Sequence, residues 1–433
     1  MRSRRLLSVL AAALVVACGG GGGGTTAPAQ LGALKSAVQV TFWHALSGNL
    51  QTQLTALTDS FNSSQSNVHV NLVAKGAYTD LNKAVLTGLA ANQPPDLAQC
   101  IETDAAKYNS SKALADLTPY INAADGLSSA DLKDIFPVML NAAKIKGTYY
   151  QFPFNKSTTV VYYNQDLFAA KGISSPPATW DEFFADAAKL ADSGTGVVGA
   201  EGPSIDTFLS MLYEYGGHLY DNDGSPTKAA VNSDAGIKVM TLWSNAIKAG
   251  AAKPIPAGNF ADQADFVNQK TAMYISTQVS YQFITKPIGS KFKFAEAALP
   301  AGDKGVKDEM FGANLCVFNK SAKDVQHGAM LYIKHLTSAD SATTWAQKTS
   351  YMPVRQAAYK TLSGDFYTQN PSQGVGPGML SKGELIVLPS TPTSNEQRDA
   401  LNTELGNIAG LRKDPKTGLS DAATKMSDIM ATG

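Results

Sequence analysis

The sequence predicts an α/β protein in which short strands alternate with helices around an open sheet. Apolar and polar residues alternate over residues 38–43, the period of a strand, and residues 50–61 then carry apolar side chains at helical spacing. The same change recurs from residues 68–72 to residues 81–89, and a further short strand is expected at 96–101. This alternation is typical of a sheet whose ligands bind at the carboxyl ends of the strands.

A second group of alternating elements follows the turn at residues 174–177. Thr179 and Glu182 form a capping box, which marks the start of a helix. Residues 292–298 are expected to be extended, and the part beyond residue 400 carries apolar residues at helical spacing. Because one hydrophobic core stops growing near about 250 to 300 residues, a chain of 433 residues is expected to form two lobes.

The N-terminus has the pattern of an export signal. Three arginines precede an apolar run from Leu6 to Val16, which is too short to span a bilayer. Cys18 follows a small residue, as in the lipobox of bacterial lipoproteins, and the glycine run at 19–24 is typical of a flexible tether. We therefore expect a signal peptide at 1–17, a lipid-anchored tether at 18–36, and a protein held on the outer face of the cytoplasmic membrane, in the periplasm or at the cell surface. The alternative is an ordinary signal peptide with an incidental cysteine.

Composition and motifs exclude several classes of function. Removing residues 1–17 takes three arginines from 36 basic residues against 36 acidic ones, so the mature net charge is 33 − 36 = −3. This charge does not indicate a surface that binds nucleic acid. The five histidines lack metal-ligand spacing, and no nucleophile-elbow serine pattern occurs. Residues 194–199 fit the letters of a dinucleotide fingerprint but follow a helix, so a turn is expected there. No metal, no cofactor and no enzymatic activity are predicted.

Cys100 and Cys316 each lie inside an apolar, strand-like stretch. A cysteine in a strand usually behaves as a small hydrophobic residue. We therefore expect two buried free thiols and no disulfide. No segment after the signal is apolar for about 18 residues, so no membrane-spanning helix is expected.

Aromatic, amide and hydroxyl residues at the expected loops, among them Trp43, suit a hydroxylated ligand, because such a ligand offers apolar C–H faces and hydrogen-bonding edges. Arg398 lies three and seven residues before Leu401 and Leu405, so on a helix it shares their buried face. A guanidinium on a buried face needs an anionic partner. Spacing favours an internal salt bridge with Asp or Glu and leaves open an anionic group of a ligand.

Three stretches carry the patterns of one protein family in the family's own order: Leu114–Ile121, Val161–Phe168 and Pro176–Glu182. Through them the chain resembles the family 1 extracellular solute-binding proteins of ABC importers, over nearly the whole mature chain. The motifs Val40–His44 and Pro153–Thr158 are most similar to those of the sn-glycerol-3-phosphate-binding members of that family.

The resemblance implies a two-lobed α/β fold of the periplasmic-binding-protein type (type II), with the ligand cleft between the lobes. It places lobe 1 at residues 37–153 with 300–345. It places lobe 2 at residues 154–299 with 346–433.

Carried over residue by residue, the resemblance implies ligand contacts from both lobes and a further hydroxyl near Ser276 to Ser280. With Trp43 from the loops, the candidate ligand-binding residues are Trp43, Tyr78, Glu102, Ser157, Ser280, Gly312, Tyr351 and Arg398. Arg398 would then meet the anionic group of the ligand. The chain departs from the pattern at Glu201–Asp206, where those proteins place tryptophans. The resemblance therefore leaves the exact ligand open.

The implied function is capture of a glycerol-phosphate-like or carbohydrate solute by lobe closure, with hinges at residues 154–157 and 292–298, and delivery to a membrane permease. The alternatives are a sugar or oligosaccharide binder of the same family, a secreted glycoside hydrolase and a purely structural surface lipoprotein. The expected partners are the small-molecule solute, the ABC permease subunits and the membrane, the last through the lipid anchor only. A monomer is expected.

Overall fold

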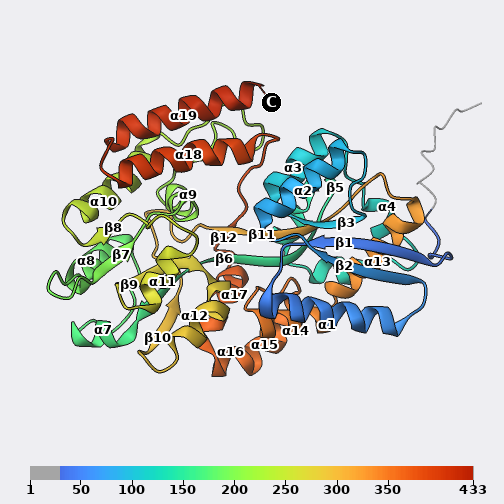
Figure 1. Ribbon diagram of the computed structural model, residues 1–433, viewed down its shortest axis with the longest axis horizontal. Helices are drawn as coiled ribbons and strands as arrows, with labels where there is room; N and C mark the ends of the chain where they lie inside the picture. The colour runs from blue at the N-terminus through green and yellow to red at the C-terminus, as the bar shows by residue number, and fades with distance from the viewer. Residues whose placement is uncertain (1–29, 433) are drawn as a thin grey trace, which may run out of the picture.

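Two lobes lie side by side and share one sheet (Figure 1). The structure is a computed structural model that describes residues 30–432. The predicted signal peptide at 1–17, Cys18 and most of the predicted tether lie outside the described residues.

The first third of the chain alternates strands and helices as predicted. Its elements are β1 (Val38–His44), α1 (Gly48–Ser64), β2 (Val68–Ala74), α2 (Tyr78–Ala90), β3 (Leu97–Cys100), α3 (Glu102–Ser110), α4 (Thr118–Ile121), α5 (Ser129–Asp134), α6 (Pro137–Ala142), β4 (Lys144–Ile145) and β5 (Thr148–Tyr149). Strand β1 pairs in parallel with β2 and β3. The helices that connect these strands pack on the sheet and complete the first lobe.

The middle of the chain builds most of the second lobe. Its elements are β6 (Phe152–Asn164), α7 (Gln165–Ala170), α8 (Trp180–Leu190), β7 (Val198–Glu201), α9 (Ile205–Glu214), α10 (Asp234–Lys248), β8 (Ala252–Lys253), α11 (Ala261–Val267), β9 (Thr271–Thr277), η1 (Gln278–Ser280), α12 (Tyr281–Ile288) and β10 (Phe294–Ala297). The capping box that begins α8 is present, since Thr179 Oγ1 accepts from the backbone N–H of Glu182 at 3.2 Å. The predicted turn is found at residues 193–196, and residues 198 and 199 already belong to β7.

The last third returns to the first lobe and then ends on the second. Its elements are β11 (Asp308–Val317), α13 (Lys323–Leu336), α14 (Ala339–Thr349), α15 (Gln356–Gly364), α16 (Phe366–Gln369), η2 (Pro371–Gly374), α17 (Val375–Lys382), β12 (Leu385–Ile386), α18 (Ser394–Ala409) and α19 (Pro415–Thr432). Helices α18 and α19 lie together across the top of the second lobe in Figure 1. They bury the predicted faces, with Leu401 and Leu405 on one and Leu419 and Met426 on the other.

Strand β6 joins the two lobes. Its first half, from Phe152 to Thr158, pairs antiparallel with β11, and its second half pairs with β9 and β10. The predicted crossing at residues 154–157 therefore falls within β6. The predicted crossing at 292–298 is wrong, because β10 pairs with β6 inside the second lobe. The second strand that passes between the lobes in Figure 1 is β11.

Each lobe has its own hydrophobic core. The first is built around Phe42 and Leu315, and the second around Trp180 and Trp243. One predicted lobe boundary is placed too early, because residues 351–385 contribute to the first core and not to the second. The order of residues along the chain does not show which lobe this segment contacts.

Cys100 and Cys316 form a disulfide, so the prediction of free thiols is wrong. Strands β3 and β11 are antiparallel neighbours, and the Cα atoms of the two cysteines are 6.0 Å apart. The two residues are 216 positions apart in the sequence, and only the insertion of β11 beside β3 brings them together.

Within residues 30–432, no helix is long and apolar enough to cross a membrane. The same part of the chain contains no cluster of three His, Cys, Asp or Glu side chains that could hold a metal ion.

Candidate ligand-binding site

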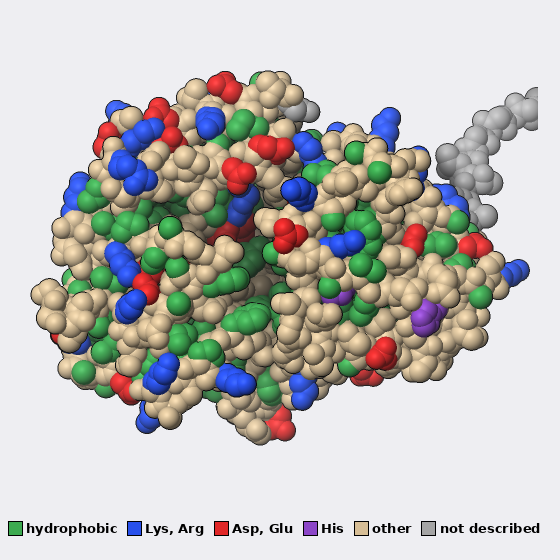
Figure 2. All heavy atoms as spheres, in the orientation of Figure 1, with side chains coloured by type: hydrophobic (Ala, Val, Ile, Leu, Met, Phe, Trp, Pro, Cys, Tyr) green, Lys and Arg blue, Asp and Glu red, His purple; other side chains and the backbone are tan. Residues whose placement is uncertain are grey.

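A cavity of about 350 Å³ lies between the lobes. Figure 2 shows it as a hollow near the centre of the molecule, with apolar side chains on its wall and charged groups deep inside. Its polar and aromatic lining residues are Tyr78, Glu102, Thr103, Ser157, Asp206, Tyr220, Thr277, Glu309, Phe311, Tyr351, Ser390, Ser394, Gln397 and Arg398. Its other lining residues are Ile101, Leu209, Leu219, Val279, Met310, Gly312, Val387, Leu388, Pro389, Leu401 and Met426.

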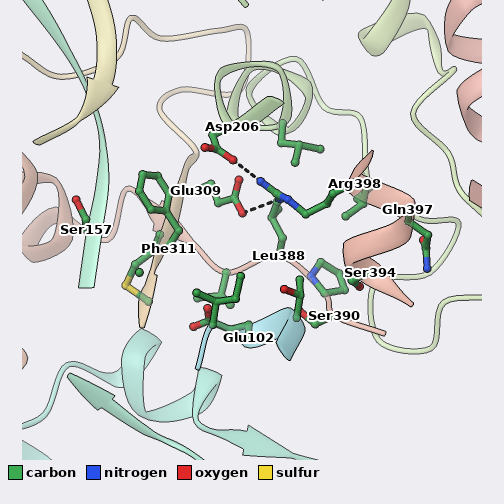
Figure 3. A pocket seen from close by; sticks show the side chains of 18 of the residues that line it. Glu102, Ser157, Asp206, Glu309, Phe311, Leu388, Ser390, Ser394, Gln397 and Arg398 are labelled. Atoms are coloured by element: carbon green, nitrogen blue, oxygen red, sulfur yellow. Dashed lines mark hydrogen bonds and ion pairs between the residues drawn. The ribbon is translucent and has the colours of Figure 1, made fainter. Parts of the chain in front are cut away.

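Arg398 is held by two carboxylates at one side of this cavity (Figure 3). Its Nη2 donates to Oδ1 of Asp206, and its Nη1 donates to Oε1 of Glu309 at 3.3 Å. Asp206 lies on α9, Arg398 on α18 and Glu309 on β11. The internal salt bridge that the spacing of Arg398 favours is therefore present.

Glu309 is the most buried member of this group. Its side chain is 9% exposed, against 29% for Arg398 and 35% for Asp206. Burial raises the pKa of Glu309, while the nearby Arg398 opposes that shift. Glu309 Oε2 and Thr103 Oγ1 are buried oxygens with no hydrogen-bond partner among residues 30–432. Both residues line the cavity.

The first lobe contributes a second charged group. Glu102, the first residue of α3, accepts from Lys156 Nζ at 2.5 Å and from Asn314 Nδ2 at 3.0 Å. Lys156 is fully buried on β6 and also donates to the carbonyl of Gly312 at 3.3 Å. The pairing neutralises a lysine that would otherwise be costly to bury. It also holds the Glu102 carboxylate at the cavity wall.

Two tyrosines form an aromatic part of the first-lobe wall. Tyr78 OH accepts from Asn155 Nδ2 at 2.7 Å, and Asn155 Oδ1 accepts from Gln99 Nε2 at 2.9 Å. Burial raises the pKa of Tyr78 well above its usual value. Tyr351 stacks on Trp345 with ring centroids 5.8 Å apart. These contacts fix both rings in place before any ligand arrives.

Gly312 lies where β11 approaches β6 closely. Its φ of +102° is in the region that favours glycine, and an added Cβ would lie 2.3 Å from the carbonyl oxygen of Asn155. Only glycine therefore fits here.

Six of the eight predicted site residues line the cavity: Tyr78, Glu102, Ser157, Gly312, Tyr351 and Arg398. Trp43 and Ser280 do not line it. Strand alternation turns Trp43 away from the side of Phe42, and its ring lies under Lys75 Nζ, 3.8 Å from the ring centroid. Ser280 Oγ contacts Ser276 Oγ at 3.0 Å, and the hydroxyl at the cavity is that of Thr277, which contacts Ser157 Oγ at 2.6 Å.

Sequence reasoning missed the second-lobe carboxylates and their neighbours. Asp206 lies in the segment where the chain departs from the glycerol-phosphate pattern, which was the one available signal. Glu309 is the second residue of β11, and two adjacent buried carboxylates, Asp308 and Glu309, are unusual at the start of a strand. Tyr220 and Gln397 face the cavity from loop and helix positions that carry no distinguishing pattern.

A family model for bacterial extracellular solute-binding proteins matches residues 56–373 of this chain. The chain is 28% identical over 417 residues to the sn-glycerol-3-phosphate-binding periplasmic protein UgpB of Yersinia enterocolitica, covering 91% of this chain and 92% of that one. It is 25% identical over 419 residues to the protein of the same name from Rhizobium meliloti, with coverage of 92% and 95%.

Solved structures share the fold at lower identity. The GacH receptor of Streptomyces glaucescens, whose structures include complexes with acarbose, matches with a TM-score of 0.79 and 20% identity over 92% of this chain and 99% of that one. UgpB from Mycobacterium tuberculosis in complex with glycerophosphocholine matches with a TM-score of 0.78 and 19% identity, again over 92% and 99%. The two-lobed α/β architecture is thus shared with proteins solved with different ligands.

Proposed function

Because the chain belongs to the bacterial extracellular solute-binding proteins, we propose that it captures a neutral, hydroxyl-rich solute, such as a sugar, for an ABC importer. The family match confirms the resemblance to extracellular solute-binding proteins that the sequence motifs carry. The similar solved structures confirm the two-lobed type II fold. The ligand class is argued from the cavity in the following paragraphs.

The charge of the cavity carries the proposal. Among the described residues that line it, Arg398 is the only basic one, and Asp206 and Glu309 already hold its guanidinium. A phosphate would meet the negative charge of Asp206 and Glu309 beside a guanidinium whose charge they already balance. Like charges close together in a partly buried site disfavour each other. A neutral ligand avoids that repulsion.

The unpartnered atoms of the cavity support the same ligand class. Glu309 Oε2 accepts hydrogen bonds, and the Thr103 hydroxyl can donate or accept one, so both can pair with sugar hydroxyls, which also do both. A fully ionised phosphate has only acceptor oxygens, so it would leave the carboxylate oxygen unsatisfied. Tyr78, Phe311 and Tyr351 add aromatic surface for the C–H faces of a sugar ring.

A glycerol phosphate ester is the second candidate ligand. It is supported by the relatives from Yersinia enterocolitica and Rhizobium meliloti, which are named sn-glycerol-3-phosphate-binding proteins, and by the position of Arg398 in the cavity. A phosphate ester bound at Arg398 would lie close to the carboxylates of Asp206 and Glu309. Asp206, from the segment that replaces the tryptophans, disfavours this ligand by its charge.

Closure of the two lobes over the ligand is the mechanism we propose. The cavity walls come from both lobes, and α3 of the first lobe contacts α18 of the second. Asn395 Nδ2 donates to Asp104 Oδ1 at 2.9 Å, and Lys107 Nζ lies 3.3 Å from Glu396 Oε1. A ligand that touches both walls binds the closed form more tightly and therefore shifts the population toward it. The closed form would dock as a monomer on the permease, and no bond of the solute is made or broken.

Export and anchoring complete the proposal. The signal at 1–17 and the lipobox around Cys18 support a lipoprotein on the outer face of the cytoplasmic membrane. Mass spectrometry of protein purified from its native membrane should find a lipid-modified Cys18 at the N-terminus. An unmodified protein cleaved elsewhere would contradict the anchor.

A thermal-shift and calorimetry panel tests the ligand class. We expect neutral mono- and oligosaccharides to include a binder that raises Tm, with compaction in small-angle scattering when it is added. We expect sn-glycerol 3-phosphate and glycerophosphocholine to give no shift at the same concentration. Tight binding of either phosphate compound without any sugar binder would reverse the assignment. Recovery of intact saccharide after long incubation separates a binding protein from a glycoside hydrolase.

A further inference from the structure

A cavity of about 600 Å³ lies in the first lobe and shares no lining residue with the ligand-binding cavity. Its wall is formed where α2 and α3 end and where α13 begins. Asn319 Nδ2 donates to the backbone carbonyl of Lys112, which ties these parts of the wall together. The lining residues are Leu89, Asn92, Pro94, Ser111, Lys112, Ala113, Asn319, Lys320 and Lys323. Because all of them belong to one lobe, closure of the cleft does not build this cavity.

The charged side chains that line this cavity are all positive. They are three exposed lysines, and no Asp or Glu lines the cavity: Lys112, Lys320 and Lys323. Within residues 30–432, none of the three makes an ion pair. The mature chain as a whole carries more acidic than basic residues, so this wall differs from the average surface in the sign of its charge. A group of unneutralised ammonium groups attracts anions.

Two acidic residues, Asp96 and Asp324, lie near this wall in the sequence but do not line it. Asp96 accepts from the Ser321 hydroxyl at 2.6 Å and from the backbone N–H of Thr41 at 2.8 Å, so it is tied to β1. Burial, and then nearby carboxylates that include Asp324, raise the pKa of Tyr120, which places Asp324 on the side of α13 that faces α4. The lysines therefore surround a hollow that contains no opposing charge.

The described chain begins close to this cavity. Gln30 Nε2 donates to the backbone carbonyl of Asn122 at 2.9 Å, directly after α4. From α4 itself, Tyr120 OH donates to Gln326 Oε1 at 2.9 Å, and Gln326 Nε2 donates to the carbonyl of Asn319 at 3.2 Å in the cavity wall. Figure 1 shows α4 and α13 together at the end of the first lobe that faces away from the second lobe. The end of the lobe from which the predicted tether leaves is thus also the end that carries the lysines.

We propose that this cavity and its three lysines form a membrane-facing surface that binds the headgroups of anionic phospholipids such as phosphatidylglycerol. The inference goes beyond solute capture and rests on the anchor proposed above at Cys18. A glycine-rich chain of about 12 residues, as from Cys18 to Gln30, has an end-to-end distance of about 20 Å. The anchor therefore keeps this end of the first lobe near the bilayer, where the phosphodiester groups supply the anions. Binding there holds the first lobe and leaves the second lobe free to close.

The test uses the mature chain with a single tetradecyl chain attached to Cys18 through maleimide. Cys18 is the one cysteine of that chain outside the disulfide, so the attachment is specific and does not depend on native acylation. One such chain gives only weak, reversible membrane binding, so an added contribution from the lysines is measurable by co-sedimentation with vesicles.

We expect the protein to bind phosphatidylglycerol vesicles at least about tenfold more tightly than phosphatidylcholine vesicles at low salt, since each lysine near an anionic membrane contributes about fivefold. The preference should disappear in about 0.5 M NaCl. Replacing Lys112, Lys320 and Lys323 together with alanine should reduce the preference to within about twofold of none.

The matched control replaces three lysines of the second lobe with alanine, which changes the net charge by the same amount. Lys171, Lys248 and Lys291 are exposed and lie outside every ion pair of the described residues. This control should keep the full preference. Equal affinity of the wild type for both kinds of vesicle, or the same loss in the control as in the cavity variant, overturns the membrane-binding surface. Because the tetradecyl chain replaces the native lipid, neither result depends on whether mass spectrometry finds a lipid on native Cys18.

Discussion

Asp206 accepts a hydrogen bond from Arg398 across 192 residues of sequence, joining α9 to α18 at the wall of the cavity. Asp206 also ends the segment in which the chain lacks the tryptophans of the glycerol-phosphate pattern. The segment without the tryptophans therefore also supplies one of the two carboxylates that hold Arg398, which supports the neutral ligand proposed above.

The pair should be visible in a double-mutant cycle. Arg398→Met and Asp206→Asn each break it, and the double variant removes both charges. Because both side chains are only about two-thirds buried, we expect a coupling energy of about 1 to 3 kcal/mol in urea unfolding. Additive single effects, with no coupling, would show that the ion pair does not form in solution.

Gly312→Ala should damage both stability and binding. The Cβ of alanine would clash with the carbonyl oxygen of Asn155 and force β11 away from β6, and the positive φ is unfavourable for alanine. We therefore expect the free energy of unfolding to fall by more than about 2 kcal/mol in chemical unfolding. Gly406→Ala is the control, since Gly406 lies within α18 with open space around it. Alanine there should stabilise the protein by up to about 1 kcal/mol. Similar behaviour of the two variants would contradict the close approach at Gly312.

The disulfide between Cys100 and Cys316 should support the first lobe. It closes a loop of 216 residues, and replacing both cysteines with alanine is expected to cost about 2 to 5 kcal/mol. Peptide mapping without reduction should recover the two cysteines in one linked species. Detection of both as free thiols in freshly purified protein would restore the original expectation.

Asp308→Asn should change how stability depends on pH. Burial is the main cause that raises the pKa of Asp308 from 3.8 to about 7. In this window the folded state holds a proton that the unfolded state has lost, so the residue costs stability as pH rises from about 4 to about 7. Asparagine cannot ionise, so relative to wild type the variant should gain about 2 to 4 kcal/mol across that window.

The measurement for Asp308 is urea unfolding of both proteins at several pH values. The asparagine side chain can still accept a hydrogen bond from the backbone N–H of Thr159 and can still contact Ser210 Oγ. In the wild-type protein these two groups lie 3.0 and 2.6 Å from the Asp308 carboxylate. A wild-type and variant difference that stays constant with pH would show that Asp308 titrates normally in the folded protein.

Local patterns determined much of this protein from sequence alone. The alternation of strands and helices, the cap at Thr179 and the buried faces of α18 and α19 depend on residues within one or two turns of each other, and all are found as predicted. The need of Arg398 for an anionic partner also follows from spacing, because a helix fixes which side chains share a face.

Only the tertiary structure decided which distant residues meet. Three relationships depend on the order of strands in the sheet and on which lobe each helix covers. Arg398 pairs with Asp206, Cys100 pairs with Cys316, and residues 351–385 belong to the first core. Periodicity shows only which face of a helix or strand is buried. It does not show which other element covers that face. The ligand class depends on these distant pairings, because they determine which charges in the cleft are already neutralised before a solute enters.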